Sequence, residues 1–315
     1  GTLLAAADAR HENTRDLPGR ISLVLRRSFD RGKTWTPIQT IRGVPEGGVG
    51  DPSFLLDPRS GRIWCFHAYG PPGIGFPTAK PGATTGPTTL QVHAIHSDDD
   101  GASWSQPIDL TPQIKDPAWQ AVFVTSGTHV AISSGRFLLP LVVRDGQGIM
   151  SARNAYSDDR GTTWKTGPAI GPETDESHTV ELPGGVILQN MRKGLVRAIA
   201  RSTDGGISFG PVENDPALTD PKCNAGITRY RRGKQDLLLF TNAASTKREN
   251  LTIKISRDHG RTWSQGRSLH PGPAAYSTVI PLRDGTIAVL YERGTQHAVE
   301  KITFARFPLA WAEQP

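Results

Sequence analysis

A short motif recurs five times along this chain of 315 residues and constrains its fold more than any other feature. Its pattern is Ser-x-Asp-x-Gly-x-Thr or Ser, followed by Trp or Phe. The copies begin at Ser28, Ser97, Ser157, Ser202 and Ser256. Five copies of one pattern do not arise by chance, so the chain is built from repeated units.

Each copy follows an apolar or alternating run, such as Ile21–Leu25 before the first and Leu251–Ile255 before the fifth. This order predicts that each copy forms the turn of a β-hairpin. The Asp carboxylate can accept hydrogen bonds from backbone N–H groups of the turn. The Gly allows a positive φ, and the aromatic residue packs beside the hairpin as a large apolar plug.

The spacing of the copies, roughly 45–70 residues, is close to the blade periods of β-propellers. At about 50 residues per blade, the chain has room for about six blades. No stretch shows a long apolar periodicity of 3.6 residues, and short strands alternate with turns rich in Gly and Pro. We therefore predict an all-β, six-bladed β-propeller that occupies residues 1–315 as a single domain.

The net charge of +6 does not indicate nucleic-acid binding, because the arginines are scattered and form no basic run. It is equally compatible with an acidic small ligand. No apolar run reaches about 18 residues, so we expect no membrane span. No signal peptide is visible at Gly1, which predicts a chain that is either cytosolic or already processed.

The chain has two cysteines, Cys65 and Cys223. We favour two buried thiols, with a disulfide as the alternative. Neither cysteine has metal-ligand spacing with a histidine, and the nine histidines form no His-x-x-x-His pair, so we expect no metal site.

Local motifs carry a more specific resemblance. The five repeats resemble the Asp-boxes of the sialidase superfamily, and three strand motifs resemble that family's aspartate turn, glutamate strand and tyrosine strand. They are Gly50-Asp51-Pro52-Ser53, Thr179-Val180-Glu181-Leu182 and Ala275-Tyr276-Ser277-Thr278. Along essentially its full length the chain is most similar to secreted actinobacterial sialidases. The resemblance implies a secreted, monomeric glycoside hydrolase that acts on sialylated glycans without a cofactor.

Tyr276 and Glu181 are the expected nucleophile and its base. A carboxylate nucleophile would be repelled by the carboxylate on the anomeric carbon of a sialoside, whereas a phenol is neutral, and sialidases are known to use tyrosine. A phenol with a pKa near 10 needs an adjacent base at neutral pH. The resemblance gives that role to Glu181, although a tyrosine such as Tyr276, taken alone, is more often a core residue with a satisfied hydroxyl.

Asp16 is the expected acid/base residue, because the resemblance places that role in the loop Arg15-Asp16-Leu17-Pro18-Gly19. The role requires a carboxyl group close to the leaving oxygen. Asp8 and Glu12 are the alternatives, and a solvated loop aspartate without a role is the other interpretation.

A substrate carboxylate calls for arginines, whose planar forks bind it through two hydrogen bonds. The resemblance implies three of them, and it assigns the second to Arg197 and the third to Arg248. Arg192 is the alternative for the second position, and Lys254 is a less suitable alternative for the third.

Two further residues, Arg10 and Asp51, resemble the pair that contacts a ring hydroxyl on the side opposite the glycosidic bond. His67, Trp119 and Phe123 either wall the pocket or belong to the core.

The family's first arginine lies in an Arg-Ile-Pro triplet on a strand before the one that starts near Gly1, and no such triplet occurs here. Either the first inner strand is missing from this sequence or the triad is incomplete. We favour the first explanation, in which the given sequence lacks the strand. A protein that had truly lost this strand would expose an unpaired edge of its first blade.

The function expected from these residues is that of a retaining exo-α-sialidase, which forms a covalent glycosyl-tyrosine intermediate. Three alternatives stay open: a sialic-acid-binding propeller without turnover, an enzyme specific for the deaminated sialic acid, and a trans-sialidase.

Overall fold

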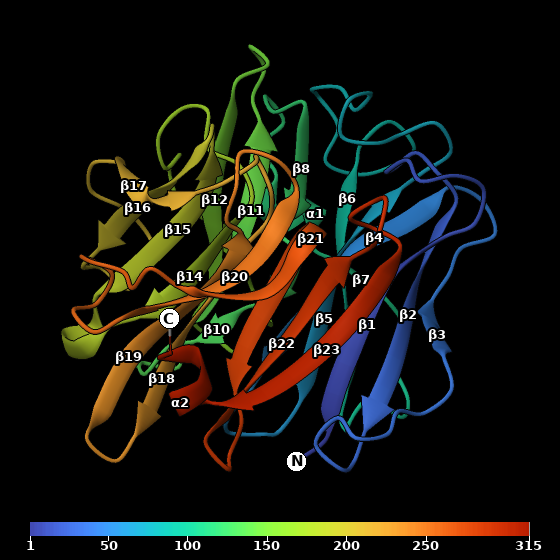
Figure 1. Cartoon of the computed structure of the whole chain (residues 1–315). Coiled ribbons are helices and arrows are strands. Elements are labelled where there is room, and N and C mark those ends of the chain that lie inside the picture. The colour runs from blue at the N-terminus through green and yellow to red at the C-terminus, as the bar shows by residue number, and fades with distance from the viewer. Residues whose placement is uncertain (315) are drawn as a thin grey trace. The chain divides into compact units, whose positions relative to one another are not determined.

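The structure is a computed structural model that describes residues 1–314 (Figure 1). Strands dominate it, and the all-β prediction is confirmed. The helical segments in this part of the chain are each a single turn: α1 (Thr111–Ile114), a 3-10 turn (Pro183–Gly185) and α2 (Leu309–Ala312). No helix within the described residues is long and apolar enough to cross a membrane.

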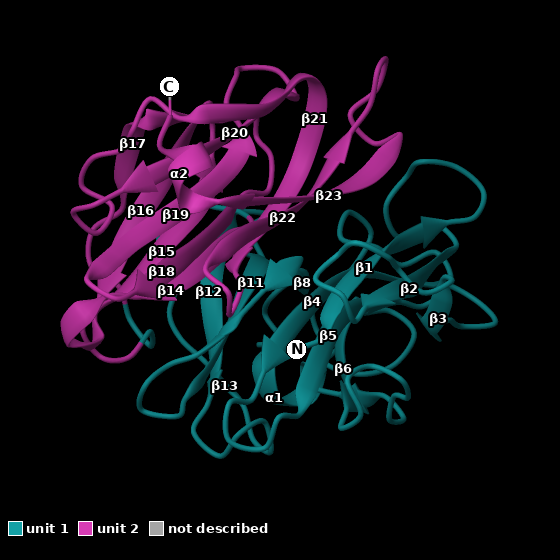
Figure 2. Cartoon of the chain, turned by 60° about the horizontal axis from the view of Figure 1, so that its bottom comes forward, with its two compact units in different colours: residues 1–175, 206–208 teal, residues 176–205, 209–315 magenta. Residues whose placement is uncertain are grey.

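The chain divides into two compact units, which Figure 2 shows in two colours. Unit 1 comprises Gly1–Asp175 and Gly206–Ser208, and unit 2 comprises Glu176–Gly205 and Phe209–Pro315. Each unit is described by itself below.

Unit 1 contains three sheets, in which neighbouring strands are antiparallel except for the parallel pair β4 and β9. The first sheet has the order β1 (Leu3–Arg10), β2 (Ile21–Ser28), β3 (Gln39–Arg42). The second has the order β7 (Ile108–Asp109), β6 (Gln91–Ser97), β5 (Ile63–Gly70), β4 (Gly48–Leu56), β9 (Gly127–Thr128). The third has the order β10 (Val130–Ala131), β11 (Phe137–Arg144), β12 (Met150–Ser157), β13 (Lys165–Thr166), with β8 (Ala121–Val124) also paired to β11.

Unit 2 contains two antiparallel sheets. The smaller has the order β14 (Ser177–Glu181), β15 (Ile187–Lys193), β16 (Val196–Ser202), β17 (Glu213–Thr219). The larger has the order β18 (Gly226–Arg232), β19 (Gln235–Ala243), β20 (Glu249–Ser256), β21 (Arg267–Pro281), β22 (Thr286–Arg293), β23 (Lys301–Pro308).

Residues 1–314 thus form five hydrogen-bonded sheets, and not the six that the blade count predicted. The difference arises at β21, which is 15 residues long, about three times the usual strand length. Residues Arg267–Pro273 of this strand pair with β20, and residues Ala274–Pro281 pair with β22. One continuous strand therefore joins two groups of strands into a single six-stranded sheet.

All five repeats form hairpin turns, as predicted. Each begins at the last residue of a strand and leads into the strand paired with it: β2 to β3, β6 to β7, β12 to β13, β16 to β17 and β20 to β21. In the first copy the Thr34 N–H donates to Asp30 Oδ1 at 2.9 Å and the Thr34 hydroxyl to Asp30 Oδ2 at 2.6 Å. The Gly32 N–H donates to Ser28 Oγ at 2.7 Å. The turn is thus closed by its own side chains.

The residue before the glycine of each repeat also has a positive φ, which the sequence did not indicate. These residues are Arg31, Asp100, Arg160, Gly205 and His259, with φ between 57° and 74°. A non-glycine residue rarely adopts this conformation. The double glycine Gly205-Gly206 of the fourth repeat satisfies the same need without a side chain.

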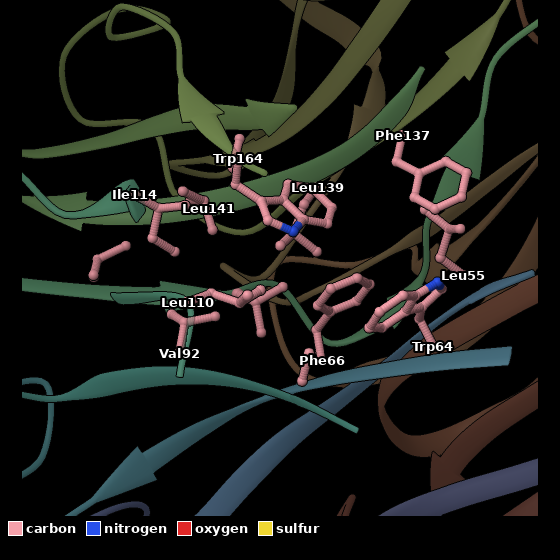
Figure 3. Close-up of a cluster of buried hydrophobic side chains, with 14 of the residues drawn as sticks. Leu55, Trp64, Phe66, Val92, Leu110, Ile114, Phe137, Leu139, Leu141 and Trp164 are labelled. Atoms are coloured by element: carbon pink, nitrogen blue, oxygen red, sulfur yellow. The ribbon is translucent and has the colours of Figure 1, made fainter. Parts of the chain in front are cut away.

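The aromatic residue of the third repeat lies in the core of unit 1 (Figure 3). Trp164 is 3% exposed and contacts Phe66 of β5 edge to face, with ring centroids 5.4 Å apart. Leu139 and Leu141 of β11 belong to the same cluster, so the third repeat helps to pack the second sheet against the third. A Cβ atom on Gly161 would lie 3.0 Å from the Trp64 ring, so glycine is also required there for close approach.

Candidate functional site

The expected nucleophile, Tyr276, lies within β21 in unit 2 and is hydrogen-bonded to a buried carboxylate. Its hydroxyl donates to Oε2 of Glu176 at 2.7 Å, and Nη1 of Arg192 lies 3.4 Å from the same hydroxyl. Glu176 also accepts a hydrogen bond from Arg192 Nη1 at 2.7 Å. The three side chains form a closed triangle of phenol, carboxylate and guanidinium.

Strand register brings Glu176 and Arg192 together. In the ladder of β14 and β15, Ser177 pairs with Met191, and the Arg192 N–H extends this ladder by donating to the Glu176 carbonyl at 2.8 Å. Glu176 and Arg192 are therefore cross-strand neighbours, whose side chains point to the same face. The Glu176 side chain is 4% exposed and that of Arg192 is 22% exposed, so the arginine is the more accessible of the two.

Arg248 also lies against Tyr276. Its guanidinium lies over the phenol ring, with Cζ 5.6 Å from the ring centroid, and its Nη2 donates to the Lys222 carbonyl at 3.4 Å. Arg248 is exposed, in contrast to Glu176. Lys254, the alternative to Arg248, instead donates its ammonium to the Ala217 carbonyl at 2.9 Å. Two accessible guanidinium groups thus flank one phenol.

The surroundings keep the phenol protonated. Burial raises the pKa of Tyr276 well above its usual value, and the negative charge of Glu176 raises it further. The Arg192 guanidinium lowers the pKa of Tyr276, but by less than burial and Glu176 raise it. A neutral phenol that donates to a carboxylate is ready to lose its proton to that carboxylate once a bond forms at its oxygen.

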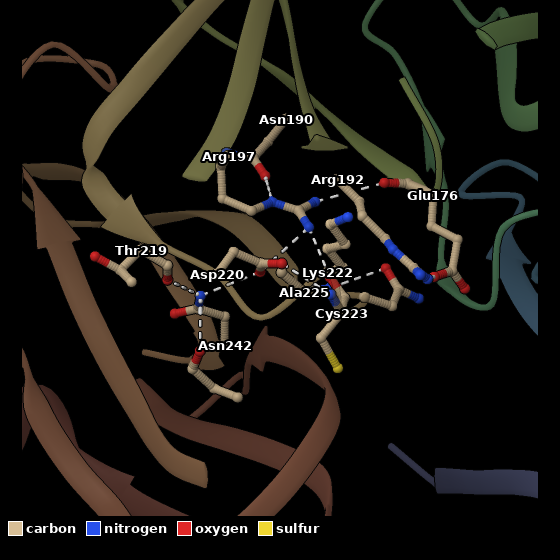
Figure 4. A network of polar contacts seen from close by, with 12 residues as sticks. Glu176, Asn190, Arg192, Arg197, Thr219, Asp220, Lys222, Cys223, Ala225 and Asn242 are labelled. Atoms are coloured by element: carbon tan, nitrogen blue, oxygen red, sulfur yellow. Dashed lines mark hydrogen bonds and ion pairs between the residues drawn. The ribbon is translucent and has the colours of Figure 1, made fainter. Parts of the chain in front are cut away.

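The structure corrects the assignment of Arg197 to substrate binding. Its side chain is fully buried, and its donors point to groups of the protein itself (Figure 4). They are Asn190 Oδ1 at 2.8 Å, the Cys223 carbonyl at 2.7 Å, Asp220 Oδ2 at 3.4 Å and the Glu176 carbonyl at 3.5 Å. Arg197 therefore cannot offer a fork to a ligand, and Arg192, directly opposite it on β15, occupies the accessible position.

The partner of Tyr276 also differs from the expectation, which named Glu181. Glu181 ends β14, whereas Glu176 directly precedes it, so the two are about 16 Å apart along an extended strand. Their odd separation also places their side chains on opposite faces. The sequence signal for Glu176 is a carboxylate immediately before the run Ser177–Val180, which carries no Asp, Glu, Lys or Arg, a position where burial costs free energy unless the charge has a partner.

Unit 1 contains a second cluster of charged residues, in and around the hairpin of β1 and β2. Nη2 of Arg10 lies 2.7 Å from Asp16 Oδ1 and 3.6 Å from Asp8 Oδ2. Although burial lowers the pKa of Arg10, the carboxylates of Asp16 and Asp8 raise it more, with a smaller effect from Asp51. The structure thus brings Arg10 and Asp16 together. Asp16 is the accessible carboxylate, with a side chain that is 87% exposed against 17% for Asp8.

Asp51 lies in a bulge of β4 and has a positive φ of 61°. Its backbone N–H donates to Asp8 Oδ1 at 3.1 Å, and its Oδ1 accepts the hydroxyl proton of Ser126 at 2.9 Å. Because a bulge re-aims a side chain, this strained position is typical of a functional residue. Arg10 and Asp51, expected as a pair, are both connected to Asp8.

His67, Trp119 and Phe123 have different surroundings. His67 is fully buried in β5, and burial is the main cause that lowers its pKa to about 3, with the nearby His93 adding to the effect. His67 is therefore a core residue. Trp119 is also buried and packs under the guanidinium of Arg153, while Phe123 contacts Phe76 edge to face. Cys65 and Cys223 are both buried free thiols, as favoured from the sequence.

No group of three or more His, Cys, Asp or Glu side chains in residues 1–314 is arranged to hold a metal ion. The side chains brought together in unit 2 can instead bind an anion and move a proton, because two guanidinium groups and a carboxylate surround one phenol.

Comparison with known proteins shows which family and which relatives this chain resembles. Residues 1–289 match the family described as BNR repeat-like domain. The chain is 39% identical over 333 aligned positions to a sialidase of Micromonospora viridifaciens, covering 99% of this chain and 50% of that protein. It is 35% identical to a sialidase of Bacteroides fragilis, covering 94% of this chain and 58% of that protein.

Among solved structures, a Hadza microbial sialidase superposes with a TM-score of 0.90 at 31% identity, covering 99% of this chain and 64% of the other. This likeness shows an all-β propeller fold. The chain spans between half and two thirds of the length of these relatives.

Proposed function

Because this chain belongs to the family of BNR repeat-like domains, we propose that it is an exo-α-sialidase, a glycoside hydrolase that removes terminal sialic acids from glycans. The observation that carries the proposal is the hydrogen bond between the Tyr276 hydroxyl and the buried Glu176 carboxylate, flanked by Arg192 and Arg248. Sialidases are the glycosidases that use tyrosine as nucleophile. The names of the relatives agree with this chemistry.

Substrate binding falls to Arg192 and Arg248 in this proposal. A sialoside carries a carboxylate next to the glycosidic bond, and a guanidinium binds such a group through two parallel hydrogen bonds. Both arginines are accessible and both lie beside the phenol. Arg192 is already charge-paired with Glu176, which holds its side chain in place before substrate arrives.

The first chemical step is the attack of the Tyr276 oxygen on the anomeric carbon. The phenol proton passes to Glu176, a bond forms between the tyrosine oxygen and the sugar, and the bond to the leaving oxygen breaks. The leaving oxygen takes a proton from Asp16. In the second step water attacks the same carbon and gives a proton back to Asp16, while the released tyrosine oxygen recovers its proton from Glu176. Two displacements at one carbon retain its configuration.

The charged cluster of unit 1 supplies the remaining roles. Asp16 is assigned the acid/base role because it is the exposed carboxylate of its loop and the resemblance of that loop indicates it. Arg10 and Asp51 are assigned to a sugar hydroxyl, since a guanidinium and a carboxylate offer a donor and an acceptor.

We also propose that the six-stranded sheet of unit 2 corresponds to two blades, which would make six blades in all. The change of partner along β21, from β20 to β22, supports this count. The family match runs through both units, which supports a single catalytic domain over residues 1–315.

The test is turnover of a fluorogenic aryl sialoside and of sialyl-lactose. NMR identifies which anomer of the released sugar appears first. We expect hydrolysis by the wild type with the α-anomer appearing first. Glu176→Gln should lower kcat by about 10²–10⁴-fold, the usual range for loss of a general base, and Glu181→Gln is the matched control that should keep activity. Binding without turnover would leave a sialic-acid-binding protein, and the β-anomer first would contradict the tyrosine mechanism.

A further inference from the structure

The strand that carries Tyr276 contains a β-bulge at that residue. Ala274 pairs with Arg293 and Ser277 pairs with Tyr291, so β21 advances by three residues where β22 advances by two. Ala275 and Tyr276 therefore lie opposite the single residue Glu292. A bulge of this kind bends the strand and changes the direction of a side chain, and it is common beside active sites.

A carboxylate holds the bulge in place. The backbone N–H of Tyr276 donates to Oε2 of Glu292 at 3.1 Å. Within a bulge the extra residue is left out of the regular ladder. An N–H group that is left unpaired away from water costs free energy, so the Glu292 side chain stabilises the bulged register.

The residue after the bulge shows what depends on this register. The hydroxyl of Ser277 bonds to the carbonyl and the hydroxyl of Thr241 on β19, both at 3.0 Å. Neighbouring side chains of a strand point to opposite faces, and a slip by one residue exchanges those faces. Loss of the bulge would turn the phenol of Tyr276 away from Glu176 or break the contacts of Ser277.

We propose that Glu292 is a positioning residue, whose carboxylate fixes the bulge through the Tyr276 N–H and thereby aims the phenol oxygen at Glu176. This inference rests on the proposed function, in which Tyr276 is the nucleophile. It adds a second carboxylate with a separate role, because Glu176 takes the proton of the hydroxyl whereas Glu292 holds the backbone of the same residue.

The positioning role requires a hydrogen-bond acceptor and not a negative charge. Two substitutions of Glu292 should therefore differ in their effect. Glu292→Gln keeps an acceptor oxygen at the same reach, whereas Glu292→Met keeps the length and removes the acceptor. Glu300 offers a matched control, because its carboxylate accepts the backbone N–H groups of Thr295, Gln296 and His297 in a loop of the same unit. Glu300→Met removes a backbone-binding carboxylate of the same type without touching Tyr276.

Two measurements test the proposal on the full chain. The first is hydrogen–deuterium exchange at the Tyr276 amide, which we expect to be protected in the wild type and in Glu292→Gln and at least tenfold less protected in Glu292→Met. The second is steady-state kinetics with the aryl sialoside. We expect kcat of Glu292→Met to fall by about 10–100-fold, because a displacement of about 1 Å can cost 10²-fold, with KM within threefold. Glu292→Gln and Glu300→Met should keep kcat within threefold.

Several results would overturn the inference. If exchange at the Tyr276 amide is unchanged in Glu292→Met, the hydrogen bond from this amide to Glu292 does not protect it. If kcat is unchanged in the same variant, Glu292 does not position Tyr276. Equal losses in the Gln and Met variants show that charge matters instead, and a rise in KM alone makes Glu292 a substrate contact. An inactive wild type contradicts the proposed function and, with it, the positioning role, while the exchange measurement still decides whether Glu292 binds the strand.

Discussion

Replacing Arg197 with methionine should destabilise the protein strongly, because four acceptors around its guanidinium each lose one hydrogen-bond donor. One of them is the carboxylate of Asp220, which is fully buried. Removing one partner of a buried ion pair costs about 3–5 kcal/mol, since the other charge stays buried without compensation. At about 2 °C per kcal/mol for a protein of this size, Tm should fall by about 6–10 °C.

The assay is urea and thermal unfolding followed by tryptophan fluorescence. A double variant, Arg197→Met with Asp220→Leu, replaces both charges by apolar groups, and such replacements are often neutral or stabilising relative to the pair. It should therefore recover part of the loss, because Asp220 Oδ1 also accepts the buried Cys223 N–H at 2.8 Å and leucine cannot replace that hydrogen bond. The matched control is Arg192→Lys, which keeps a charge beside Glu176 but loses the fork. We expect its stability to change by less than about 1 kcal/mol, as for a partly exposed pair, while KM rises.

A structural role of Arg197 is refuted if Arg197→Met keeps the Tm of the wild type and changes only KM. That result would return Arg197 to the substrate carboxylate. It would also mean that the contacts of Arg197 with Asn190 and Cys223 contribute nothing to folding.

Three other perturbations give distinct outcomes. Asp16→Ala should lower turnover of sialyl-lactose by about 10²–10⁴-fold, the usual share of general acid catalysis, and retain far more on an aryl sialoside; equal losses on both would point to loop structure instead. Arg248→Lys should raise KM because a point charge cannot reproduce the fork, and unchanged kinetics would remove Arg248 from the site. Acid should destabilise the protein in two ranges set by depressed pKa values. His67 stays neutral in the fold with a pKa of about 3, so stability falls as the pH drops from about 6.5 to about 3 and His67→Leu should reduce that slope. Hydrogen bonds from Thr163 hold the pKa of Asp159 at about 2, so the contribution of Asp159 to the free energy of unfolding is lost between about pH 4 and pH 2. Asp159→Asn should reduce the pH dependence of stability only in that lower range, as measured by urea titrations at each pH.

The repeats show what a sequence can predict well. The turn at Asp30 depends on residues within a few positions of each other, so the pattern alone predicted the hairpin, the role of the aspartate and the conformation of Gly32. The identities of Tyr276 and Arg248 were also predicted from short motifs, and the structure brings these two residues together.

The errors in unit 2 have a common cause. Glu181 was named where the structure has Glu176 beside Tyr276, and Arg197 was preferred to Arg192. The first outcome depends on which end of β14 lies beside Tyr276, and the second on which of two paired residues, Arg192 of β15 or Arg197 of β16, does so. The alternation of a strand indicates which residues share a face, but it carries no information about which end approaches another strand far along the chain. The burial of Arg197 likewise depends on Asp220, which is 23 positions away.

The shared strand β21 has a consequence for how unit 2 opens. Local unfolding proceeds in cooperative groups of strands, and groups without a common strand can open separately. Here the strands β18–β20 and the strands β22–β23 are joined through one backbone, with the change of partner at Pro273 and Ala274 only two residues before Tyr276. Amides on both sides of that point should therefore exchange at similar rates under conditions that favour opening. Tyr276 lies where two halves of a sheet are joined, so neither half can open without disturbing it.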